Sequence, residues 1–217
     1  MKKYILSVLL GGAFMFTACS DFLDEEPKGD ITSEGYYKTA QHAISATNAI
    51  YDYLIIGYAP NGLWDKNYGG TFYNDYWVLQ DMFADNSETN QTSIDYQSVE
   101  NMQIDQYNQP VELLWRDFYQ TIKCCNVVID KVPSIDMDVT LRNQLVAEAK
   151  FFRAMMYFDL IRMFGDVPLR EHNVESAAED VTSRTSKETI YELIFSDLKT
   201  AETDLKYAER FGGGRPY

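Results

Sequence analysis

The segment from residue 138 to residue 164 places the strongest constraint on how this chain folds. Its second half, FFRAMMYFDLIRMF, is apolar around nearly the whole helical circumference. A helix of this kind is buried on most of its sides, because no polar face is left for water. Gly165 and Pro168 follow it and end the helical pattern. We therefore expect a central helix that is buried on most sides.

Other segments with apolar residues at three- and four-residue steps predict further helices. These helices cover residues 40–56 and 111–131 and the stretch that ends near residue 205, and a short apolar helix covers 75–84. Thr39 suits the N-cap of the first helix, and Pro110 suits the first turn of another. Thr185 and Glu188 have the spacing of a capping box at the start of the last helix.

The alternation of apolar and polar residues that marks a β-strand is missing from the sequence, which predicts an all-α fold. Residues 57–74 and 85–109 have no regular pattern and are expected to be long irregular loops. Pro133 and Pro168 each follow a valine at the end of a predicted helix and lie 35 residues apart. That spacing is near the tetratricopeptide period of about 34 residues and gives weak support to a repeat of helix pairs.

The N-terminus predicts a secretory signal, because a short basic start precedes a short apolar run. The order Phe16-Thr17-Ala18-Cys19 resembles a bacterial lipobox, which implies cleavage before Cys19 and lipidation of its side chain. An ordinary secretory signal with an incidental cysteine is the alternative. We expect a signal peptide at 1–18, an acidic tether and lead-in at 19–38, and a helical domain at 39–217.

Charge and cysteine content exclude several classes of protein. The net charge of the chain is -14, whereas nucleic acids and anionic lipid headgroups attract basic surfaces. Only three cysteines occur. Cys124 and Cys125 are neighbours in a helical pattern, where a disulfide would be strained, so we interpret them as core residues.

At residues 148–169, EAKFFRAMMYFDLIRMFGDVPL, the sequence resembles the SusD/RagB family of Bacteroidetes outer-membrane lipoproteins. The family has the same succession of an acidic-Ala-basic-Phe start, Arg-Ala, Tyr-Phe-x-Leu and Phe-Gly-Asp-Val-Pro-Leu. Asn126 occupies the position of the family's asparagine in the helix before it. With the lipobox, the resemblance extends over nearly the whole chain, from Met1 to Tyr217.

This resemblance implies tetratricopeptide-like helix pairs and a non-catalytic lipoprotein that captures oligosaccharides. It also implies a partner, a SusC-like TonB-dependent transporter in the outer membrane, and a location on the outer face of that membrane. The acidic residues after Cys19 are similar to the surface-export signal of such lipoproteins. Family members are usually about twice as long, so we expect this chain to be an N-terminal portion that lacks the second half of the scaffold.

Catalytic and metal-binding motifs do not stand out. No phosphate loop, Gly-x-Ser-x-Gly or His-Glu-x-x-His motif is present in the sequence, and His42 and His172 lie far apart. We therefore expect no cofactor, no metal and no catalytic residues. Loop acids such as Asp85 with Glu88 have the chemistry of calcium ligands, but solvated acids are the simpler interpretation. Paired carboxylates of a glycoside hydrolase remain an alternative that acid abundance alone does not support.

Sugar binding requires flat rings and hydrogen-bonding side chains close together, and the two irregular segments contain this mixture. The candidate ligand-binding residues are Trp64, Tyr68 and Tyr73 in the first and Asn90, Asp95, Tyr96 and Gln97 in the second. Packing of the three rings of the first segment on the helical scaffold is the structural alternative. Capture of peptides or glycopeptides on the same scaffold is the functional alternative.

Overall fold

The computed structural model describes residues 36–58, 64–72, 75–90, 92–174 and 183–205, and its main compact unit begins at Tyr37. The predicted signal peptide, Cys19 and nearly all of the predicted tether lie outside the described residues. The predicted domain boundary at residue 39 stays a prediction. None of the described helices has the length and apolarity needed to span a membrane.

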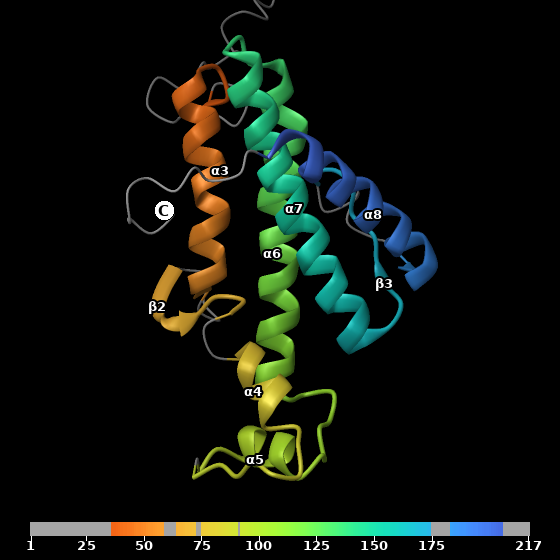
Figure 1. Cartoon of the computed structure of the whole chain (residues 1–217). Coiled ribbons are helices and arrows are strands. Elements are labelled where there is room, and N and C mark those ends of the chain that lie inside the picture. The colour runs from red at the N-terminus through yellow and green to blue at the C-terminus, as the bar shows by residue number, and fades with distance from the viewer. Residues whose placement is uncertain (1–35, 59–63, 73–74, 91, 175–182, 206–217) are drawn as a thin grey trace, which may run out of the picture. The chain divides into compact units, whose positions relative to one another are not determined.

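The described residues form a helical unit with very short strands, which confirms the predicted all-α class (Figure 1). The α-helices are α3 (Ala40–Ile55), α4 (Asp75–Asp81), α5 (Ile94–Glu100), α6 (Gln109–Lys131), α7 (Val139–Phe164) and α8 (Lys187–Asp204). A 3-10 turn, η3 (Val132–Ser134), joins α6 to α7. Helix α7 packs between α6 and α8, and α3 packs against both α6 and α7.

Two short antiparallel strand pairs are present that we did not predict, and the first lies largely in the segment 57–74, where we expected an irregular loop. Strand β1 (Ile56–Tyr58) pairs with β2 (Trp64–Gly69), and β3 (Val167–Pro168) pairs with β4 (Arg184–Thr185). Strands of two to six residues are too short to show a convincing alternation in the sequence. Helix α5 was not predicted either. Val99 is its one buried residue, so the helix has no repeating apolar positions that its sequence could display.

Helix α7 contributes to two apolar clusters, one along its first half and one along its second half. Tyr157 and Leu160 pack with residues of α6 and α8, whereas Ala149 and Phe152 pack with residues of α3 and α6. This arrangement confirms the predicted central helix. Two of its aromatic side chains are not buried as the sequence predicted, since Phe151 is 39% exposed and Phe158 is 41% exposed. A narrow apolar stripe of α7 therefore faces outward.

Most helix ends follow the signals in the sequence. The amide of His42 donates to Thr39 Oγ1 at 3.3 Å, and Gly165 ends α7 with a φ of 70° that suits glycine. The predicted capping box at Thr185 is wrong. Thr185 is held in the β3–β4 ladder opposite Val167, so the helix starts one residue later and Ser186 is its N-cap.

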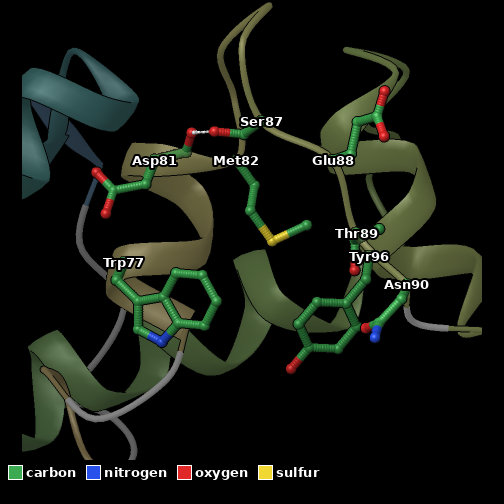
Figure 2. A pocket seen from close by; sticks show the side chains of 8 residues that line it. All are labelled: Trp77, Asp81, Met82, Ser87, Glu88, Thr89, Asn90 and Tyr96. Atoms are coloured by element: carbon green, nitrogen blue, oxygen red, sulfur yellow. Dashed lines mark hydrogen bonds between the residues drawn. The ribbon is translucent and has the colours of Figure 1, made fainter.

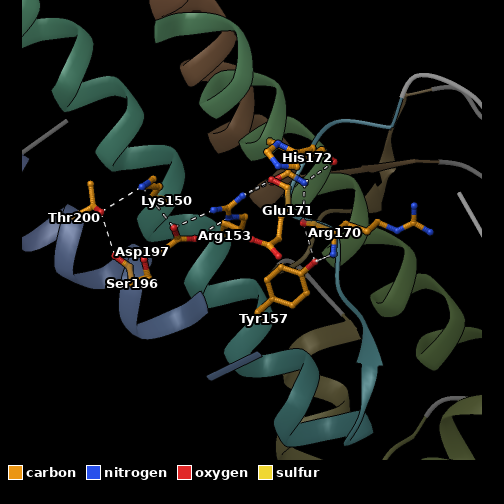
Figure 3. Close-up of polar contacts among 10 residues, drawn as sticks. Lys150, Arg153, Tyr157, Arg170, Glu171, His172, Ser196, Asp197 and Thr200 are labelled. Atoms are coloured by element: carbon orange, nitrogen blue, oxygen red, sulfur yellow. Dashed lines mark hydrogen bonds and ion pairs between the residues drawn. The ribbon is translucent and has the colours of Figure 1, made fainter. Parts of the chain in front are cut away.

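Buried polar groups join α7 to α8 and to the chain that follows α7 (Figure 3). Arg153 donates from Nη1 to Asn126 Oδ1 at 2.8 Å and to the Glu171 carbonyl at 2.7 Å. Asn126 donates in turn to the carbonyls of Arg170 and His172, at 2.9 and 3.1 Å. Because these donors and acceptors are paired, the network fixes residues 170–172 without leaving a buried charge unpaired.

The adjacent cysteines behave as core residues, as expected. Both are free thiols, and Cys125 is fully buried against α3 and α7. Burial raises the pKa of the Cys124 thiol to about 11 and raises the pKa of Cys125 well above its usual value. The two sulfurs are therefore protonated and unreactive near neutral pH.

Candidate functional site

An open pocket of about 710 Å³ lies beside the short helices α4 and α5 (Figure 2). Its lining residues come from α4, from the segment that follows it, and from the first turn of α5. They are Trp77, Asp81, Met82, Ser87, Glu88, Thr89, Asn90 and Tyr96. Rings, hydroxyl groups, an amide and carboxylates thus surround one space.

A small apolar cluster supports the floor of this pocket. Val78, Met82 and Val99 are buried together, with Tyr96 packed against them. Val78 and Met82 are four residues apart and occupy the buried side of α4 and of the residue just beyond it. Trp77 therefore points away from the cluster and is 46% exposed. Figure 2 shows the rings of Trp77 and Tyr96 on either side of the Met82 side chain.

Hydrogen bonds hold the segment between α4 and α5 in place. Ser87 Oγ donates to the Asp81 carbonyl at 2.8 Å, at the end of α4. The Thr89 amide donates to Glu100 Oε2 at 3.1 Å, at the end of α5. The segment 87–90 is therefore attached to both helices, which holds its side chains at the pocket.

Two buried carboxyl groups, Asp75 and Asp117, interact with each other, and Asp75 contacts a residue of the pocket. The Tyr96 hydroxyl donates to Asp75 Oδ1 at 3.4 Å, which links the ring of the pocket to the first residue of α4. Burial raises the pKa of Asp75 to about 6, against the opposing effects of Tyr96 and Arg116. Burial also raises the pKa of Asp117 to about 7, although Arg116 Nε lies 3.9 Å from Asp117 Oδ1. These groups change charge close to neutral pH.

The structure brings together only part of the predicted ligand-binding set. Asn90 and Tyr96 line the pocket, whereas Asp95 and Gln97 lie on α5 and are not among its lining residues. Trp64 and Tyr68 belong to β2, but their side chains and the whole of Tyr73 lie outside what the structure describes. The roles of these residues in ligand binding stay predictions.

Sequence reasoning missed Trp77, Asp81 and Glu88 as pocket residues. We predicted only a short apolar helix at 75–84, so Trp77 did not stand out as a binding residue. The buried pair Val78 and Met82 defines the phase of α4, and this i, i+4 spacing was the available signal for an outward Trp77. In the described part of the chain, no three potential metal-ligating side chains are grouped together.

Fold and pocket together define an all-α protein of helix pairs with an open site lined by rings and polar groups. The chain belongs to the SusD-like family, because residues 21–207 match a family model described as "Starch-binding associating with outer membrane". The predicted family and its tetratricopeptide-like fold are confirmed.

Individual relatives support this assignment. SusD-like protein P38 of Formosa agariphila is 30% identical over 210 residues, which are 94% of this chain and 39% of that protein. A solved laminarin-binding SusD-like protein has a TM-score of 0.63 and 25% identity, over 81% of this chain and 37% of that one. The fold is shared with a SusD superfamily structure from Bacteroides vulgatus, with a TM-score of 0.68 and 23% identity over 82% of this chain and 37% of that one.

The matched relatives are longer, as expected, and they exceed the expected factor of about two. This chain spans between 35% and 39% of the length of the curated relatives that it matches.

Proposed function

We propose that this chain binds oligosaccharides in the pocket between α4, residues 87–90 and Tyr96. The observation that supports this most is the pair of rings, Trp77 and Tyr96, with hydroxyl, amide and carboxylate groups around them. A pyranose packs its C–H face on an aromatic ring, and each hydroxyl left without a partner costs about 1–3 kcal/mol. The pocket volume of about 710 Å³ is in the range of ligand sites, about 300–1,000 Å³.

The comparisons support a carbohydrate ligand. The matching family model is described as starch-binding, and one solved relative is named for laminarin binding. Affinity electrophoresis of the full-length chain through gels that contain single polysaccharides tests the proposal. Retardation by at least one of them is expected. Retardation by none, together with binding to a peptide panel, would favour the alternative of peptide or glycopeptide capture.

The same proposal includes binding without cleavage. Asp81 and Glu88 both line the pocket, so a glycoside hydrolase is the alternative that this site raises. Incubation of the full-length chain with the polysaccharide that retards it should release no reducing sugar. Steady release that is lost in an Asp81→Asn or Glu88→Gln variant would replace capture by hydrolysis.

We further propose that the protein is anchored in the outer membrane through lipid on Cys19 and delivers its ligand to a SusC-like TonB-dependent transporter. The lipobox and the family membership support this arrangement. A pull-down from outer membranes of the native host should recover a large TonB-dependent partner with the tagged chain. Failure to recover one under conditions that preserve other outer-membrane complexes would count against delivery to such a transporter.

A further inference from the structure

The charged residues of the pocket all have the same sign. Asp81 and Glu88 are exposed acids among its eight lining residues, and none of those eight is Lys, Arg or His. Figure 2 shows the Asp81 side chain above Trp77 and the Glu88 side chain above Tyr96, with the carboxylates at opposite edges of the view, directed away from Met82. A ligand that lies on these rings is therefore close to negative charge and has no cation beside it in the lining.

The sequence around the pocket extends this imbalance. No Lys, Arg or His occurs from residue 67 to residue 115. The acids in the same stretch are Asp75, Asp81, Asp85, Glu88, Asp95, Glu100, Asp105 and Glu112. Because this stretch includes α4, α5 and the segment between them, the part of the chain that lines the pocket is acidic or neutral.

The next cation along the chain does not compensate for this charge. Arg116 follows the stretch and lies 3.9 Å from the buried carboxylate of Asp117. Its charge also acts on Asp75, below Tyr96. The charge of Arg116 thus acts on two buried carboxyl groups, and Arg116 is not one of the lining residues. Proteins that bind carboxylate, sulfate or phosphate groups place Arg or Lys beside them, usually with paired hydrogen bonds.

We infer that this pocket takes uncharged oligosaccharides and rejects those that carry uronate or sulfate groups. The inference rests on the proposed function and names its ligand class. An anionic sugar on the rings meets two carboxylates of like charge, and like-charge contacts of this kind are strongly unfavourable for association. The rejection is electrostatic, so salt weakens it at the exposed rim, where the screening length shortens to about 3 Å at 1 M salt.

Matched pairs of ligands test this inference with the full-length chain. Neutral gluco-, manno- and galacto-hexasaccharides are compared with the same hexasaccharides oxidised at C6 to uronates, by isothermal titration at low and high salt. The neutral member of a bound pair should bind at least about tenfold more tightly than the uronate at low salt. This gap between the two affinities should narrow at high salt. A uronate that binds as tightly as its neutral partner at low salt overturns the inference and leaves the proposed function intact.

A double variant, Asp81→Asn with Glu88→Gln, assigns the effect to the pocket. It should bring the affinity for the uronate close to that for the neutral sugar, whereas Glu112→Gln, an exposed acid outside the lining, should leave the gap unchanged. An unchanged gap in the double variant overturns the role of these carboxylates. Binding of neither member of any pair overturns the proposed function itself, and the inference with it.

Discussion

Asp197 accepts two hydrogen bonds from the guanidinium of Arg153, with Arg153 Nε 2.7 Å from Oδ2 and Arg153 Nη2 3.0 Å from Oδ1. Both side chains are buried, with exposures of 5% and 2%. The paired geometry matches the planar fork of arginine, and Asn126 and the Glu171 carbonyl satisfy Nη1 of the same group. This pair joins α7 to α8 across 44 residues of sequence.

Asp197→Ala is expected to destabilise the chain severely. The substitution leaves the Arg153 guanidinium buried without its carboxylate partner, which costs about 3–5 kcal/mol in comparable buried pairs. Chemical denaturation of the full-length variant measures the free energy of unfolding. Glu202→Ala, which removes an exposed acid from the same helix, is the matched control. A decrease in the free energy of unfolding below about 1 kcal/mol for Asp197→Ala would show that the pair contributes no more than a solvent-exposed salt bridge.

The buried carboxyl of Asp117 predicts a pH dependence of stability. Burial raises its pKa from 3.8 to about 7 in the folded chain, so the folded state holds this proton more tightly than the unfolded state does. The residue therefore favours folding below about pH 4, and this contribution is lost as the pH rises from about 4 to about 7. Asp117→Asn abolishes the loss, because an amide does not ionise.

The free energies of unfolding of Asp117→Asn and of the unaltered chain should be compared from pH 4 to pH 8. The variant should gain relative stability with rising pH, by up to about 1.4 kcal/mol for each pH unit between the two pKa values. The negative charge of Asp75 adds to the raised pKa of Asp117 and so supports the same trend. Asp136→Asn removes an exposed acid as the control. A difference that stays constant over this range would contradict the buried ionisable group.

Replacement of Cys19 tests the proposed anchor. Cys19→Ser should move the protein from the envelope fraction to the soluble fraction of the native host, because several acyl chains on one cysteine give stable anchoring, whereas one chain is marginal. Cys124→Ser, at a partly buried position of α6, should leave the protein in the envelope. A Cys19→Ser variant that still partitions with envelope membranes would refute lipid anchoring at this position.

The helices were predictable because their signals are local. Helix α6 begins beside Pro110, α7 ends at Gly165, and both depend on steps of three or four residues that a sequence displays directly. The roles of Asn126 and Arg153 were not predictable from periodicity. Their partners, residues 170–172 and Asp197, are distant in sequence, and only the packing of α6, α7 and α8 brings them together.

The pocket was predictable only in part, for a related reason. Asn90 and Tyr96 stood out because polar and aromatic residues share an irregular segment. Trp77 becomes part of the site only when Val78 and Met82 turn toward Val99 and fix the phase of α4. A single apolar run does not reveal which of its residues face outward.

The affinity of Trp77→Ala for an oligosaccharide that the unaltered chain binds tests the central claim most directly. Trp77 is half-exposed beside the pocket, so its removal should deprive the sugar of one ring face and weaken binding by about tenfold or more. Tyr107→Ala, which removes a ring that is 78% exposed and not in the lining, should leave the affinity unchanged. Equal affinities of Trp77→Ala and the unaltered chain, measured by isothermal titration, would contradict ligand capture at this pocket.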